Sequence, residues 1–529
     1  MQQLNSHDAM FVHFDNENWA AHGGIVGIYD PSTAPGGTVR FRDILAHLER
    51  RLPRSPVFRR RLVRVPMDLD NPYWIEDEHF DLEFHVQHLR LPQPADWRQL
   101  CITIARLDSR PLDLNRPPWE MHVIEGLDHV DGVPAGSYAI STKLHHAAVD
   151  GHSVRDIMTA IHDLTADVDD AAPQDNWAPE PRPGSAALLG RALVNNFVHA
   201  PLATARAAAA MLPAAPKLAG TLLTRSGSGS GSVLLPVGGP PVPRTRFQAE
   251  VTPHRVLDGR VFDLEQIKRM RSLVDGATVN DVIVAIVGGG VRRYLAAKGE
   301  TPTGETVCGA PVDLRAGEES IGGNDIAFLT VALGAEIADP VARLRRIRHS
   351  TDQAKHMQKA IGARALSEFS ASFPGALNSW GFKALSASQL IFGSRRPMAN
   401  VGVSNVPGPQ VPLYMNGARA ERFFGVAPIF HGSALVFGVF SYCGRIEVTF
   451  VSCRRVVPDP ALLAECVQAE HDQLLAAADA TPPIEARVRR QNQAQSLWRR
   501  PRGLSCSRPV SGEHGEPVSA ATSQASSAE

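Results

Sequence analysis

Seven consecutive residues, His145 to Gly151, carry the side chains best suited to chemistry: they read His-His-Ala-Ala-Val-Asp-Gly. Imidazole titrates near neutral pH, so one histidine is a candidate base toward an alcohol or an amine. Asp150 would organise the turn, and the glycine would allow a backbone conformation that other residues resist. Histidine and aspartate also occur four residues apart at His152 and Asp156, so such pairs arise by chance. From these residues alone, a catalytic site and a structural turn both stay open.

A strand and a helix are expected on either side of this segment. Residues 136–144 mix β-branched, aromatic and polar residues in partial alternation, which predicts a strand that ends at the histidines. After the segment, apolar residues recur at helical spacing: Val154, Ile157, Met158, Ile161 and Leu164. A strand end exposes side chains in a cleft without loss of ladder hydrogen bonds, which suits a pair of reactive histidines.

The composition of the whole chain limits the classes of function. A chain of 529 residues is too long for one ordinary core, so two domains are expected. Its 54 basic and 55 acidic residues balance, which argues against general nucleic-acid binding. The six cysteines form no C-x-x-C pair, so we expect free thiols in a reducing cytoplasm. No further Cys/His cluster with zinc spacing lies near the histidines, so we expect no metal.

The pattern His-His-x-x-x-Asp-Gly resembles the active-site signature of the CoA-dependent acyltransferases. Flanking blocks narrow the resemblance to the bacterial wax ester synthase/diacylglycerol acyltransferase family. Residues 111–120 resemble that family's Pro-Leu-Asp-x-x-Arg-Pro-Leu-Trp-Glu motif, with Pro118 in place of leucine. The resemblance implies that Trp119 lies near the substrate channel, although this block is also suited to be a rigid entry to a strand over 121–125. The arginine run 59–61 is a candidate contact for CoA phosphate or a solvated junction.

Two blocks in the second half extend the resemblance. Asn280 and Asp281 match the family's Asn-Asp motif, which is implicated in shaping the active site, while Thr278 is a plausible helix N-cap there. Residues 400–409 resemble a family strand that ends in Ser-Asn-Val-Pro-Gly-Pro. Such a strand end would bring Ser404 and Asn405 to the cleft, where they are candidate substrate-binding residues and hydrogen-bond donors to an oxyanion.

The resemblance covers residues 8–477 and implies an α/β (α+β) fold. Two chloramphenicol-acetyltransferase-like domains with mixed sheets would meet at an active-site tunnel. Predicted boundaries are an N-terminal domain over 1–167, a crossover linker over 168–245, a C-terminal domain over 246–480 and a disordered tail over 481–529. The linker contains weakly cationic Ala/Leu helices, suited to a lipid surface or to packing on the protein, and then a flexible Gly/Ser stretch.

The activity that the resemblance implies is acyl transfer from long-chain acyl-CoA to the hydroxyl of diacylglycerol, giving triacylglycerol and CoA. His146 would be the general base, and His145 would orient it. Asp150 would hold the loop through an ion pair, and Gly151 would serve the turn. Wax ester synthesis on long-chain fatty alcohols, amide formation as in condensation domains, and lipid binding without catalysis are the alternatives.

The expected partners are acyl-CoA as co-substrate and a lipid alcohol, with no separate cofactor. The N-terminal residues show no signal-peptide pattern, and no apolar run reaches the roughly 18 residues of a spanning helix. We therefore expect a cytoplasmic protein that associates peripherally with the inner membrane face or with lipid droplets.

Overall fold

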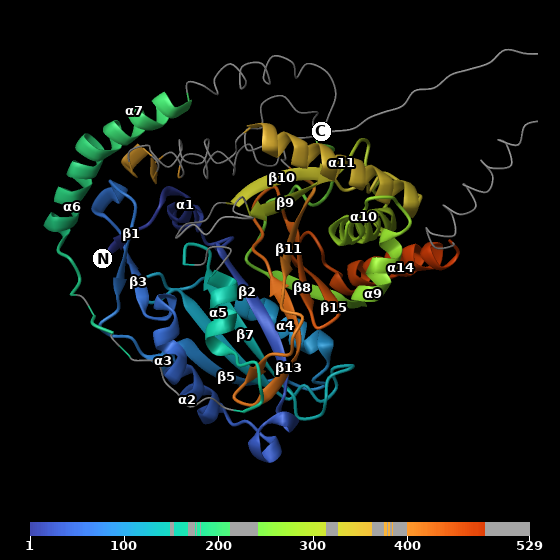
Figure 1. The fold of residues 1–529 in the computed structure, drawn as a ribbon, viewed down its shortest axis with the longest axis horizontal. Coiled ribbons are helices and arrows are strands. Elements are labelled where there is room, and N and C mark those ends of the chain that lie inside the picture. The colour runs from blue at the N-terminus through green and yellow to red at the C-terminus, as the bar shows by residue number, and fades with distance from the viewer. Residues whose placement is uncertain are drawn as a thin grey trace, which may run out of the picture. The chain divides into compact units, whose positions relative to one another are not determined.

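The computed structural model divides the chain into two units, Met1–Thr481 and Pro482–Glu529, and the second lies outside the described residues. Figure 1 shows the fold. The described residues are 1–148, 153–167, 175, 177–179, 181–211, 242–313, 326–361, 375–377, 379–380, 383 and 399–481. In this part of the chain, the strands form two six-stranded sheets and one three-stranded sheet.

The first six-stranded sheet holds the histidine pair. Its strands, in spatial order, are β12 (Tyr414–Met415), β13 (Ala418–Val426), β2 (His22–Asp30), β7 (Tyr138–His145), β6 (Trp119–Glu125) and β5 (Val86–Arg90). Neighbours are antiparallel except β5 and β6, which are parallel. The predicted strand before the histidines is confirmed as β7, and all eight of its residues are buried.

Helices cover both faces of this sheet, which explains why β7 lacks a solvent-facing side. Helix α4 (Trp97–Asp108) packs on the face that carries Val26 and Ile28 of β2. Helices α2 (Phe41–Arg51) and α5 (Ser153–Ile161) pack on the face that carries Ile140 of β7. The period-two alternation of each strand therefore sends apolar side chains into two separate cores.

The second six-stranded sheet is also mixed. Its strands, in spatial order, are β10 (Ile326–Ala332), β9 (Val307–Asp313), β11 (Val401–Pro407), β14 (Leu435–Tyr442), β15 (Arg445–Cys453) and β8 (Arg255–Asp263). β11 runs parallel to β9 and β14, and the other neighbours are antiparallel. Helix α9 (Leu264–Arg271) follows β8 directly, because Asp263 ends the strand and its side chain caps the helix.

Helix α10 (Val279–Ala297) is central to this second half and is packed by α11 (Pro340–Ile361) and α14 (Pro460–Asp479). Its three consecutive glycines permit close contact. A Cβ at Gly288 would lie 2.0 Å from the Leu333 carbonyl oxygen, and a Cβ at Gly289 would lie 2.1 Å from the Glu470 carboxyl carbon. Only glycine fits at these positions without displacement of the neighbouring elements.

Strand β13 connects the two halves of the chain. It comes from the second half but pairs with β2, with Val426 opposite Gly24 and Phe424 opposite Val26. The first sheet therefore contains strands from both predicted domains, an exchange that the linear boundaries did not include. The boundaries themselves stay a prediction.

The third sheet is small and supports the N-terminal helix. It contains β1 (Gln2–Gln3), β4 (Tyr73–Glu76) and β3 (Arg60–Val63), and α1 (Ser6–Phe14) follows β1. A long helical segment lies on it, made of α6 (Ser185–Val194), the π-helical turn η6 (Asn195–His199) and α7 (Ala200–Met211). The π turn precedes Pro201, which has no N–H to donate to the preceding turn. Short connecting helices complete the first half, among them α3 (Leu82–His85).

Candidate active site

The histidine pair is held by its backbone where β7 ends. The His145 N–H donates to the Pro118 carbonyl over 3.0 Å, and the His146 N–H donates to the Ala21 carbonyl over 2.7 Å. Pro118 is buried, and this contact uses only its carbonyl oxygen, which proline shares with leucine. The departure from the family pattern at this position therefore preserves the backbone contact to His145.

Both ring nitrogens of His145 are occupied. The ring is fully buried, Nδ1 accepts from the Ala147 N–H over 3.1 Å, and Nε2 lies 3.1 Å from Oδ2 of Asp15. This arrangement places the proton on Nε2, which donates to Asp15. The other carboxylate oxygen of Asp15 accepts from the Ala21 N–H, whose carbonyl in turn holds His146. Asp15 was absent from the sequence prediction, because no local pattern relates it to a residue 130 positions away.

His146 presents a neutral imidazole to the site. Its ring stacks on Phe11 of α1 with centroids 5.1 Å apart, and its Nε2 atom is buried. Burial, with smaller contributions from the imidazoles of His145 and His22, lowers the pKa of His146 to about 4, while Asp15 acts in the opposite direction. The ring is therefore unprotonated at neutral pH and able to accept a proton.

Residues from both halves of the chain surround the His146 ring. A Cβ at Gly23 would lie 3.2 Å from Nε2 of His146, 3.2 Å from the Val426 carbonyl oxygen and 3.7 Å from Pro428. The start of β2 and the end of β13 therefore meet beside the histidine. Glycine at position 23 leaves the space between them open.

A second set of charged groups lies behind the pair. His22, opposite His145 in the β2–β7 register, has Nε2 at 2.9 Å from the Asp108 carbonyl oxygen and 3.2 Å from its carboxylate. Arg255 at the start of β8 lies 3.9 Å from the same carboxylate. All three side chains are buried, so they join α4, the first sheet and the second sheet at this point.

Of the predicted site residues in the second half, one caps a helix and two others form a hydrogen bond with each other. Asp281 is buried, and its carboxylate accepts from both the N–H and the hydroxyl of Thr278 over 2.8 Å. It completes a capping box, so the predicted N-cap at Thr278 is confirmed. Asn280 is half-buried, and its Oδ1 accepts from Nδ2 of Asn405 over 3.3 Å. Ser404 lies next to Asn405 on β11, in register with Gly438.

Trp119 is a core residue in this structure. Its side chain is 1% exposed, its indole N–H donates to the Phe58 carbonyl over 2.9 Å, and its ring stacks on His85 at 4.6 Å. These contacts favour the structural alternative for this residue over direct substrate contact.

Each arginine of the run 59–61 forms an ion pair with a carboxylate. Arg59 pairs with Asp175, Arg60 with Glu76 and Arg61 with Asp77.

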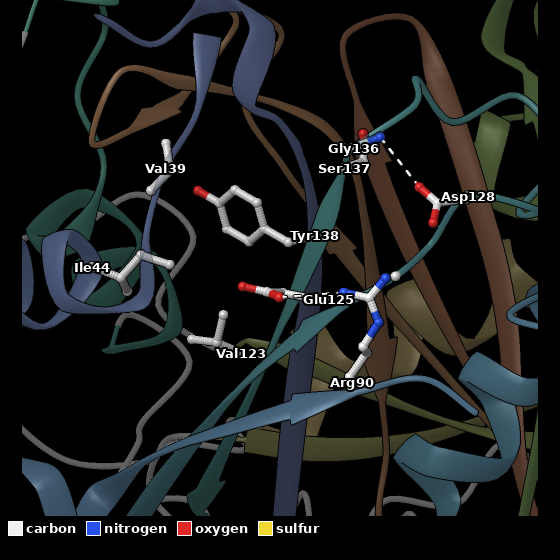
Figure 2. Close-up of a pocket in the computed structure, with 10 residues that line it drawn as sticks. Val39, Ile44, Arg90, Val123, Glu125, Asp128, Gly136, Ser137 and Tyr138 are labelled. Atoms are coloured by element: carbon white, nitrogen blue, oxygen red, sulfur yellow. Dashed lines mark hydrogen bonds and ion pairs between the residues drawn. The ribbon is translucent and has the colours of Figure 1, made fainter. Parts of the chain in front are cut away.

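A cavity of about 160 Å³ opens at the opposite end of β7 (Figure 2). Arg90, Glu125 and Tyr138 are among the residues that line it. Tyr138 begins β7 and His145 ends it, so the two sites are separated by about 23 Å of strand. The cavity is therefore distinct from the histidine site.

Two residues of the motif, Asp150 and Gly151, lie outside the described residues. In the described part of the chain, no group of three His, Cys, Asp or Glu side chains could hold a metal ion.

Comparison with known proteins shows that the chain is an acyltransferase. Residues 4–283 match the wax ester synthase/diacylglycerol acyltransferase catalytic domain, and residues 322–474 match the WS/DGAT C-terminal domain. The chain belongs to the wax ester synthase/diacylglycerol acyltransferase family. It is an O-acyltransferase, as predicted from the sequence.

Relatives cover about nine tenths of the chain. A protein of Mycobacterium tuberculosis with the provisional name diacylglycerol O-acyltransferase is 30% identical over 505 residues, covering 90% of this chain and 97% of its own. Another protein from the same species is 31% identical over 494 residues, and the match covers 91% of this chain and 99% of that protein. The solved wax ester synthase/diacylglycerol acyltransferase from Marinobacter aquaeolei VT8 has a TM-score of 0.62 at 24% identity, covering 90% of this chain and all of that one. This likeness confirms the predicted α/β fold with mixed sheets.

Proposed function

We propose that this enzyme transfers a long-chain acyl group from acyl-CoA to the hydroxyl of diacylglycerol, giving triacylglycerol and CoA. The observation that carries the proposal is the position of His146, whose buried imidazole lies at the end of β7 beside Phe11 and Gly23 in a chain of this family. The names of the relatives support diacylglycerol as the acceptor. Acyl-CoA is a co-substrate, and the proposed chemistry needs no separate cofactor.

In the proposed mechanism, His146 removes the proton from the acceptor hydroxyl while the oxygen attacks the thioester carbonyl. The tetrahedral intermediate collapses, the carbon–sulfur bond breaks, and the imidazolium returns its proton to the CoA thiolate. A low pKa favours this return, because the imidazolium is then a strong acid. Both substrates are held together, so positioning supplies much of the acceleration and no acyl-enzyme is needed.

The remaining site residues take supporting roles in this proposal. His145 positions its neighbour through Asp15, since both of its ring nitrogens are already engaged. Asn405, with Ser404 beside it, would donate hydrogen bonds to the oxyanion, and Asn280 would orient Asn405. Asp150 and Gly151 would fix the turn after the histidines.

CoA release from palmitoyl-CoA tests the proposal. It would be measured with diacylglycerol, with hexadecanol and with no acceptor, for the wild type and for His146→Ala. Loss of a general base lowers kcat/KM by about a hundredfold or more. His79→Ala is the matched control, because that side chain is 85% exposed. Acceptor-independent release, or a His146→Ala variant as active as the wild type, would refute His146 as the base.

Wax ester synthesis is the second candidate, because the family description names both activities. Hexadecanol preferred over diacylglycerol would assign it. Binding of lipid without CoA release under any condition would identify a non-catalytic lipid-binding protein.

We also propose peripheral association with the inner membrane face or with lipid droplets, where such acceptors reside. Within the described residues, no helix is both long and apolar enough to cross a membrane.

A further inference from the structure

The helical segment formed by α6, η6 and α7 is anchored to the protein through its polar residues. Nδ2 of Asn195 donates to Asp70 over 2.8 Å and to the Tyr73 hydroxyl over 3.2 Å. Nδ2 of Asn196 donates to the Leu69 carbonyl over 2.7 Å. The two asparagines therefore face the protein in the middle of the segment.

The opposite side of the same segment presents apolar side chains to solvent. Five of them form what we call the outer apolar surface: Leu193, Val194, Phe197, Val198 and Leu202, with exposed fractions of 55%, 48%, 76%, 59% and 55%. Spacings of four residues place Leu193 with Phe197 and Val194 with Val198 on one side. A surface helix in water carries polar residues on its outer side, so this apolar outer side is suited to an apolar environment.

The charged side chains of the segment itself are all of one sign. Residues 181–211 contain no aspartate or glutamate, and Arg182, Arg191 and Arg206 are exposed. Cationic residues beside an apolar face are features of helices that lie on anionic lipid.

The small three-stranded sheet links this surface to the histidine site. On β3, Leu62 packs in one cluster with Ala147, the residue after His146. Val63, its neighbour, points to the other side and packs in a cluster with Leu188 and Ala192 of α6. The outer apolar surface therefore lies on the far side of one sheet from the histidine motif.

We propose that the outer apolar surface docks the enzyme on an anionic lipid surface, from which the lipid acceptor enters. Docking is independent of the reaction, whereas delivery of the acceptor rests on the proposed function. Figure 1 shows α6 on the side of the molecule where β1 and β3 lie, and α7 continuing from it.

Vesicle flotation of the full chain, without acyl-CoA, tests the docking. Vesicles of phosphatidylcholine with phosphatidylglycerol and vesicles of phosphatidylcholine alone would be compared. Phe197→Asp is expected to weaken binding by about tenfold or more, since an exposed aromatic becomes an anion within the contact. Val411→Asp is the matched control, because Val411 is 52% exposed and lies outside the segment. Arg191→Gln with Arg206→Gln should reduce binding to the anionic vesicles only.

Three outcomes would overturn the docking proposal. If the Phe197→Asp variant bound vesicles as tightly as the wild-type protein, lipid would not contact this surface. The same result with a lowered melting temperature would show that another part of the chain covers it. A change of oligomeric state in Phe197→Asp, with vesicle binding intact, would assign the surface to a second copy of the chain. Absence of CoA release in every assay would defeat the proposed function while leaving the flotation result valid.

Discussion

At the scale of single residues, the site depends on two adjacent histidines with different environments. His145 is locked by the Ala147 N–H and by Asp15, so its ring is fixed in one tautomer and one orientation. His146 packs on Phe11, and burial keeps it neutral. The rigid first ring thereby fixes the backbone from which the second ring projects.

Asp15 is expected to act as a positioning residue. Asp15→Ala leaves the His145 Nε2–H and the Ala21 N–H without their acceptor, so His146 loses its fixed position. We expect kcat to fall by about tenfold to a hundredfold with a smaller change in KM, because the damage is to alignment. Asp15→Asn should recover part of the rate, since its amide oxygen still accepts. Glu17→Ala, an exposed acid two residues away, is the control; a wild-type kcat for Asp15→Ala would contradict this role.

The pH dependence of the reaction follows from the pKa of His146. With that pKa lowered to about 4, the imidazole stays unprotonated as the pH falls from 8 to 6. We expect kcat/KM to show no protonation step from this residue in that range, and to fall only as the pH approaches 4. Initial rates at saturating acyl-CoA and at acceptor concentrations well below KM, with folding checked by circular dichroism at each pH, measure kcat/KM for the acceptor. A loss of activity centred near pH 6.5, the ordinary histidine value, would argue against the buried imidazole as the base.

At the scale of elements, β15 carries a buried acid that the proposed chemistry does not use. Glu447 is 3% exposed, and its Oε1 has no hydrogen-bond partner among the described residues. Burial raises the pKa of Glu447 to about 8, although Arg422 and Arg445 act in the opposite direction. The folded chain therefore keeps a proton that the unfolded chain releases above its ordinary pKa of about 4.5. Stability from this group is present at low pH and is lost as the pH rises from about 4.5 through about 8.

Glu447→Gln is expected to remove that loss, because glutamine stays neutral. The difference in the free energy of unfolding, variant minus wild type, should be larger at pH 8.5 than at pH 5 by on the order of a few kcal/mol. Urea denaturation at the two pH values measures the difference. Glu265→Gln is the control, since that side chain is 76% exposed. An equal effect of Glu447→Gln at both pH values would show that the carboxyl is ionised in the folded protein.

At the scale of the whole molecule, local patterns predicted most elements and their order. The strand before the histidines and the N-cap at Thr278 are confirmed, because short-range periodicity and capping determine them. The α/β fold with mixed sheets, which the family resemblance implied, is also confirmed. Long-range contacts escaped prediction. Nothing near Asp15 or His145 in the sequence indicates their hydrogen bond, and no pattern in β13 indicates its pairing with β2 rather than with a strand of its own half.

The environment of Trp119 also depends on long-range contacts that the sequence does not reveal. Its neighbours in sequence are those of a family motif, which suggested substrate contact, whereas its burial depends on Phe58 and His85 from distant segments. A motif identifies a family more readily than it identifies the task of each residue in it.

The pairing of β13 with β2 has a consequence for how such enzymes diverge. Val426 and Pro428 belong to the second half of the gene product, yet they border the ring of His146 from the first half. Recombination between relatives at the linker would exchange the lining beside the histidine together with the entire second sheet. The two halves are therefore matched at this contact, and a substitution at the end of β13 would alter the surroundings of a residue more than 270 positions earlier in the chain.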